Sequence, residues 1–154
     1  SSRLFTEVRE KRGLCYTVRT SADHFVDSGT ISTYTGTDPK KATEALKVIL
    51  DETEKLANKI NKITKEELQK AKDYEKGHLA LSLENTKSVG SYFGYEELLI
   101  GKSTSIEEDF KGIDSVTEDE VYALAKEVFR RENINIAIIG PFEDTKEFEK
   151  VLQS

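Results

Sequence analysis

Residues 1–18 read SSRLFTEVREKRGLCYTV and predict a short helix, an abrupt helix end and then a strand. The helix is indicated by Ser2, which can cap the first turn, and by apolar side chains at helical spacing, namely Leu4, Phe5 and Val8. The end is indicated by Gly13, because glycine adopts the left-handed conformation that commonly closes helices. The first eighteen residues therefore predict a helix-to-strand corner.

Beyond Gly13 the side chains alternate with a period of two, as they do in strands. One face of this strand is expected to carry Tyr16, Val18, Thr20 and Ala22, and the other Cys15, Thr17, Arg19 and Ser21. The corner then brings Arg9, near the helix end, close to Tyr16, at the strand start. A guanidinium and a phenol held in this way can bind carbonyl groups or an oxyanion.

The rest of the chain predicts an α+β fold. A second strand at 29–36 is expected to pair antiparallel with the first, and an apolar stretch at 133–140 predicts a buried central strand. Apolar stripes and capping residues predict helices at 39–61, 64–84, 87–100 and 105–112, and from 117 and 144 onward. We expect one domain, 1–154, with a mostly antiparallel sheet and helices packed on one face.

Three strands make a thin sheet, and the chain begins inside a motif without an initiating methionine. We therefore expect a fragment of a longer protein that is truncated at its N-terminal side, with further strands upstream or supplied by a partner.

Composition excludes several classes of protein. The 154 residues are 36% hydrophobic and 34% charged, with a net charge of −6, so a nucleic acid is not the expected partner. No apolar run approaches the roughly 18 residues of a membrane helix, and no signal-peptide pattern is visible. These features predict a cytoplasmic protein that binds neither nucleic acid nor membrane.

The residues that usually carry metal or nucleophilic chemistry are sparse. His24 and His78 lie far apart in the sequence, and neither has a second histidine one helical turn away, so we expect no metal site in this chain. Cys15 has no histidine placed in the sequence to activate it, which favours a buried small hydrophobe. We expect no catalytic residue in this chain taken alone.

The corner and several later motifs resemble the second half of the inverted-zinc-motif metallopeptidases, the pitrilysin, insulysin and mitochondrial-processing-peptidase group. The most specific match comprises residues 1–5 and 7–14 together with Tyr16. Further matches follow in order along the chain: YTGTDP at 34–39, Ile63-Thr64 with Glu66-Glu67-Leu68, Glu97-Leu98 with Gly101, and IGP at 139–141.

The resemblance implies that this chain is the substrate-binding, non-metal half of a zinc endopeptidase that cleaves peptides or unstructured segments in a closed chamber. In that family one half holds zinc on a His-x-x-Glu-His helix, and the other supplies an arginine and a tyrosine, seven residues apart, that touch substrate. Arg9 and Tyr16 have this spacing. The resemblance places zinc in the other half, in cis or on a homologous subunit in trans, which makes a dimer one arrangement of the parent protein.

A purely structural role, without substrate contact, is the alternative for both Arg9 and Tyr16. On sequence alone, a salt bridge or a solvated helix face is favoured for Arg9, and an ordinary strand aromatic for Tyr16. The resemblance favours substrate contact for both, but not for Arg12. Two other functions stay open: a non-catalytic scaffold or partner subunit of the same family, and a module that adds a peptide strand to an open sheet edge.

Overall fold

The computed structural model describes residues 2–153, which divide into two compact units. The first unit comprises 2–61 and 122–153, and the second comprises 62–121. The first contains η1 (Phe5–Glu10), β1 (Cys15–His24), β2 (Gly29–Thr37), η2 (Pro39–Lys41), α1 (Ala42–Ala57), η3 (Arg131–Asn133) and α6 (Lys146–Gln153). The second contains α2 (Lys65–Ser82), α3 (Thr86–Ile100) and α4 (Ile106–Ser115), and α5 (Glu118–Val128) belongs partly to each. The expected α+β class is confirmed, while a single domain over 1–154 stays a prediction.

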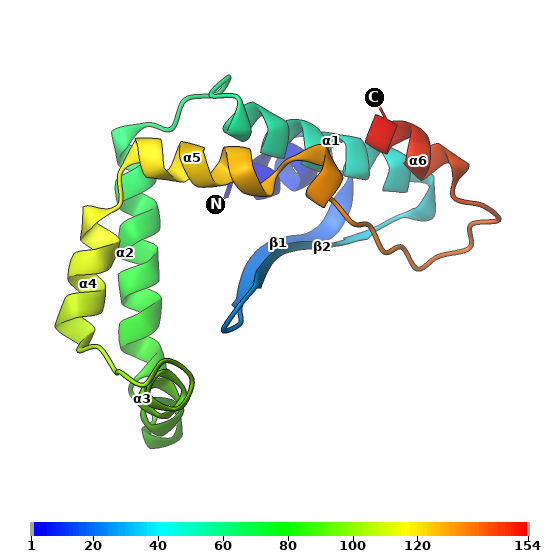
Figure 1. The fold of residues 1–154 in the computed structure, drawn as a ribbon. Helices are drawn as coiled ribbons and strands as arrows, with labels where there is room; N and C mark the ends of the chain where they lie inside the picture. The colour runs from blue at the N-terminus through cyan, green and yellow to red at the C-terminus, as the bar shows by residue number, and fades with distance from the viewer. Residues whose placement is uncertain (1, 154) are drawn as a thin grey trace. The chain divides into compact units, whose positions relative to one another are not determined.

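The core of the first unit lies where η1, β1 and α1 meet (Figure 1). Its buried side chains are Val8, Leu14, Cys15, Ala45, Val48 and Ile49. Burial of this apolar surface is the main stabilising contribution to the corner. Helix α1 is shorter than the predicted 39–61, because a 3-10 turn precedes it and Lys59, at φ +57°, reverses the chain soon after Ala57.

The first helix is a π-helix rather than an ordinary α-helix. The Lys11 amide donates to the Thr6 carbonyl at 2.9 Å, which is the i→i−5 bond of a π-turn. The expected cap is present, because the Phe5 amide donates to the Ser2 hydroxyl at 3.2 Å. Gly13 ends the helix at φ +58°, as expected. Short π-helical segments are often found at functional sites, and this one carries Arg9.

Two glycine substitutions should have opposite effects on stability. Gly13→Ala places a side chain in the left-handed region and should lower the free energy of unfolding by about 1–2 kcal/mol. Gly77→Ala, inside α2, meets no atom within 4 Å and should raise it by roughly 0.5–1 kcal/mol. Chemical denaturation of both variants checks this, and two changes of the same sign would contradict the assigned backbone of Gly13.

Strands β1 and β2 form an antiparallel pair (Figure 1). The register of the pair contains a bulge at the beginning of β1. Cys15 lies opposite Thr37 and Thr17 opposite Gly36, so Tyr16 is an extra residue without a partner in the register. The bulge shifts the alternation by one residue, and Cys15 and Val18 both reach the core. The predicted grouping of Tyr16 with Val18 on one face is therefore wrong.

The predicted central strand at 133–140 is also wrong, because 134–139 forms no strand. Apolar content alone does not make a strand, since its amide and carbonyl groups need a neighbouring ladder. Within residues 2–153 the only strands are β1 and β2, and they pair with each other. The segment consequently leaves Ile138 41% exposed and Ile139 fully exposed.

The second unit consists of helices whose starts follow the capping residues. The Ser105 hydroxyl and the Glu108 carboxylate each accept the other's backbone amide, which completes the predicted capping box of α4. Helices α2 and α4 are joined by an ion pair between Lys76 and Asp114 at 2.6 Å. Nothing among the helices of residues 2–153 combines the length and the apolar character that crossing a membrane requires.

Candidate functional site

Tyr16 occupies the bulge at the start of β1, and its side chain is 78% exposed. The residue before it, Cys15, is buried at 8% exposure in the core, so the strand is fixed at this point, and the small buried cysteine expected from the sequence is confirmed. Bulges redirect side chains and occur next to active sites. The phenol is thus presented to solvent from a rigid base.

Arg9 lies on η1, the element that packs directly against β1. Its guanidinium carbon is 4.9 Å from the centroid of the Phe5 ring, a cation–π contact that holds the side chain along the helix. Within residues 2–153, no carboxylate lies within salt-bridge distance of Arg9, and no hydrogen bond engages its guanidinium or the Tyr16 hydroxyl. Both groups are therefore available to a ligand.

Arg12 is placed quite differently. Its guanidinium donates to the Glu7 carboxylate at 2.5 Å and to the Glu7 carbonyl at 2.8 Å, and Lys11 donates to the same carboxylate at 2.6 Å. These hydrogen bonds hold the pKa of Glu7 far below its usual range, at about 2. Arg12 and Lys11 thus staple the helix end, which agrees with the structural interpretation of Arg12.

The contacts of Lys11 and Arg12 with Glu7, called the Glu7 staple from here on, should make the free energy of unfolding depend on pH. A carboxyl whose pKa falls on folding stabilises the protein above its unfolded pKa, and the contribution disappears as the pH falls toward the folded value. For Glu7 the contribution should be complete above a pH of 4.5 and lost as the pH approaches about 2. Wild type and Glu7→Gln should differ in unfolding free energy near neutral pH and converge in acid. A difference that stays constant across this range would rule out the staple as its source.

The two histidines lie on different elements. His24 ends β1, while His78 lies on α2 with its ring stacked on Tyr74 at a centroid distance of 5.8 Å. In the part of the chain that the structure describes, no three His, Cys, Asp or Glu side chains are grouped in a way that could hold a metal ion.

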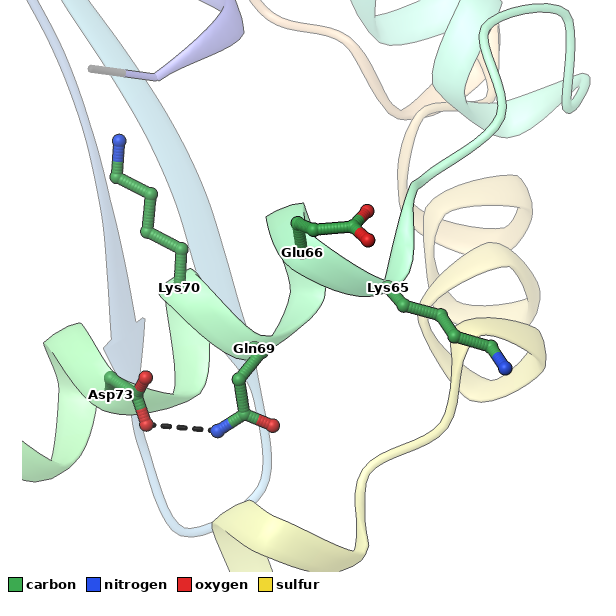
Figure 2. A pocket seen from close by; sticks show the side chains of 5 residues that line it. All are labelled: Lys65, Glu66, Gln69, Lys70 and Asp73. Atoms are coloured by element: carbon green, nitrogen blue, oxygen red, sulfur yellow. Dashed lines mark hydrogen bonds between the residues drawn. The ribbon is translucent and has the colours of Figure 1, made fainter.

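A surface depression lies on the first turns of α2 and is lined by Lys65, Glu66, Gln69, Lys70 and Asp73 (Figure 2). Figure 2 shows that all five side chains project from this one helix, with Gln69 donating to Asp73 at 2.9 Å. Because all five lining residues come from this one helix, the depression offers no binding site comparable with the corner.

A polar cluster ties α3 to α4. The Tyr92 hydroxyl donates to the Asp109 carboxylate at 2.7 Å, and the Thr104 hydroxyl bonds the same carboxylate at 2.9 Å. The Thr104 amide donates to Glu96 at 2.9 Å. Partial burial and the neighbouring Asp109 raise the pKa of Tyr92 above its usual value. Every member is engaged, so the cluster has a structural role.

Sequence reasoning missed one exposed pair, Arg19 and Tyr34. They lie directly opposite each other in β1 and β2, with the guanidinium carbon 5.3 Å from the ring centroid. Alternation along each strand could place either residue on a face, but only the register between the strands brings the two together.

Comparison with known proteins supports the resemblance carried by the corner. Residues 1–74 match the family model described as the Peptidase M16 inactive domain. The chain belongs to the M16 peptidase family. Both Arg9 and Tyr16 lie inside the matched region. Of the matched motif, Ser1 falls outside the described residues.

Relatives extend the similarity beyond residue 74. An uncharacterized zinc protease of Mycobacterium bovis is 38% identical over 154 residues, covering 100% of this chain and 34% of the relative. The uncharacterized zinc protease YmxG of Bacillus subtilis is 37% identical over 141 residues, which are 92% of this chain and 34% of the relative. This M16 chain thus spans about one third of the length of these relatives.

A solved structure shares the fold. A chain of complex III2 from Candida albicans with Inz-5 bound superposes with a TM-score of 0.73 at 26% identity, covering 82% of this chain and 30% of that chain. The agreement supports an M16-type α+β half-domain.

Proposed function

We propose that this chain is the substrate-binding, non-metal half of a zinc-dependent endopeptidase, and that Arg9 and Tyr16 contact the peptide. Support comes from the family and from relatives that are named zinc proteases. The observation that carries the proposal is the contrast within one short helix and its strand. The Arg12 guanidinium is hydrogen-bonded to Glu7, whereas within residues 2–153 the polar groups of Arg9 and of the bulged Tyr16 have no hydrogen-bond partner.

The chemistry assigned to these residues is binding and charge stabilisation. The Tyr16 hydroxyl can donate a hydrogen bond to the oxygen of a peptide carbonyl, which gains negative charge when the carbonyl is attacked. The Arg9 guanidinium can hold a backbone carbonyl or a carboxylate of the same peptide and so fix its orientation. The proposal assigns the metal to another part of the parent protein, in the same chain or on a homologous subunit.

A second candidate is a non-catalytic partner subunit. It is favoured by the similarity to a chain from a structure of complex III2, an assembly of several subunits. Such a subunit has no need for an unpaired arginine and an exposed tyrosine at the family's spacing, which is why the peptidase half is preferred. For the preferred peptidase half we also propose a cytoplasmic location and a homologous subunit as a partner.

The deciding experiment uses the full-length protein that contains this chain. It is incubated with an unstructured peptide, with zinc and with a chelator, and cleavage products are identified by mass spectrometry. Chelator-sensitive cleavage that falls sharply in Tyr16→Phe supports the peptidase half. If cleavage appears only after a second, homologous protein is added, the Tyr16→Phe variant decides: a sharp loss supports a substrate-binding half, and an unchanged rate assigns the chain to a non-catalytic partner subunit. Absence of cleavage under every condition removes the proposed function.

A further inference from the structure

Arg19 and Tyr34 form a second arginine–tyrosine pair on the hairpin that carries Tyr16. The guanidinium carbon of Arg19 lies 5.3 Å from the Tyr34 ring centroid, and the Tyr34 side chain is 58% exposed. In the described part of the chain, no carboxylate lies within salt-bridge distance of Arg19. The ring supports the guanidinium from one side, so its hydrogen-bonding edge stays available to a ligand.

The pair lies on the face of the hairpin that points away from the core. Cys15 and Val18 both reach the core, and the two residues between them, Tyr16 and Thr17, are exposed. Arg19 follows Val18 and therefore projects from the opposite face. The bulge, by turning Tyr16 away from the core, thus lines it up with Arg19 along one strand.

Between the two positions this face carries only small residues, Thr17 on β1 and Gly36 on β2. Opposite Thr17 stands Gly36, which has no side chain, so no large group separates Tyr16 from Arg19. Three residues of strand span about 10 Å, which equals three residues of an extended peptide running beside it. A peptide held at Tyr16 can therefore present to Arg19 the side chain located three positions away.

The charge of the surface selects the ligand. Arg19 is the only charged residue in the facing segments 17–21 and 32–36, whose other members are small or uncharged apart from the Tyr34 phenol. The chain as a whole carries a net charge of −6, so an acidic side chain is disfavoured over most of its surface and favoured at this guanidinium.

We infer that Arg19 and Tyr34 form a specificity subsite for an acidic side chain of the peptide substrate, about three residues from the position bound at Tyr16. The inference rests on the proposed peptide-binding role of the corner. Arg19 binds the carboxylate through its paired N–H groups, and the Tyr34 ring keeps the guanidinium in the required plane.

The test compares pairs of peptides that differ only by Glu or Gln at each position around the cleaved bond, using the full-length protein. Wild type should cleave the Glu peptide about 10-fold better in kcat/KM at one position, as expected for a single charge-assisted contact. Arg19→Gln should abolish this preference by lowering kcat/KM for the Glu peptide to the value for the Gln peptide. Arg19→Lys, which keeps the charge but not the planar fork, should give a weaker preference.

Controls separate this subsite from charge in general and from the proposed function. Arg130→Gln removes an exposed guanidinium elsewhere in the first unit and should keep the preference intact. If Arg9→Ala and Tyr16→Phe impair cleavage but Arg19→Gln keeps the Glu preference, the subsite is wrong and the proposed function stands. If no peptide is cleaved, direct binding of the same Glu and Gln peptides by fluorescence anisotropy decides. Equal affinity for the two peptides would overturn the subsite.

Discussion

Replacement of Tyr16 by phenylalanine is expected to lower kcat of the full-length protein on an unstructured peptide by about 100-fold or more, because loss of one well-placed donor to an oxyanion has effects of this size. The hydroxyl is the only group removed. It makes no hydrogen bond within residues 2–153, and its ring is 78% exposed, so folding should be unaffected. Steady-state kinetics check the loss of kcat, and a thermal unfolding curve of the same preparation checks that folding is unaffected.

The size of the effect follows from where the hydroxyl is held. Tyr16 is fixed by the buried Cys15 before it and by the strand pairing of Thr17 after it, so its backbone has little freedom. A donor held in this way requires little reorganisation when charge develops on the substrate. The expected loss should therefore appear in kcat more than in KM, because the bond strengthens as the carbonyl oxygen gains charge.

A matched control is Tyr95→Phe. Tyr95 lies on α3, is 62% exposed and loses the same hydroxyl. Its cleavage rate should equal that of wild type. Equal rates for Tyr16→Phe and Tyr95→Phe would mean that the Tyr16 hydroxyl does not contact the reacting carbonyl, and the site would then depend on Arg9 alone.

Local signals in the sequence predicted most helix starts because caps act over a few residues. Asp38 accepts the Lys40 amide at 2.9 Å, and Thr64 accepts the Glu67 amide at 3.1 Å. The stripe on α1 likewise identified the buried face. The strand predicted at 133–140 failed because a strand depends on a neighbour that local apolarity does not reveal.

The sequence singles out candidate site residues but does not reveal how the structure places them. The spacing of Arg9 and Tyr16 within a family motif singled out both residues. The bulge at Tyr16 could not be foreseen, since it depends on the register of Cys15 against Thr37 and of Thr17 against Gly36. Nor could sequence decide which arginine Glu7 would bind, because several charged side chains lie within reach on one short helix.

Two arginines three residues apart should therefore respond in opposite ways to truncation. Arg9→Ala is expected to lower kcat/KM on a peptide by about 10- to 100-fold, the loss typical of a charge-assisted hydrogen bond to a ligand, with little change in thermal stability. Arg12→Ala is expected to lower the unfolding temperature, because it removes the partner of the Glu7 carboxylate and carbonyl, and to change kcat/KM little below that transition.

The contrast rests on partners rather than on chemistry, since both side chains carry the same guanidinium. Among the described residues, the guanidinium of Arg9 contacts the Phe5 ring at 4.9 Å, which positions the group without using its N–H donors. Arg12 donates hydrogen bonds to the carbonyl and the carboxylate of Glu7. Arg9→Lys should restore part of the activity, because the charge returns without the bidentate fork. If Arg12→Ala lost activity while remaining folded and Arg9→Ala did not, the substrate-binding guanidinium would be that of Arg12, and the staple on Glu7 would have to open when peptide binds.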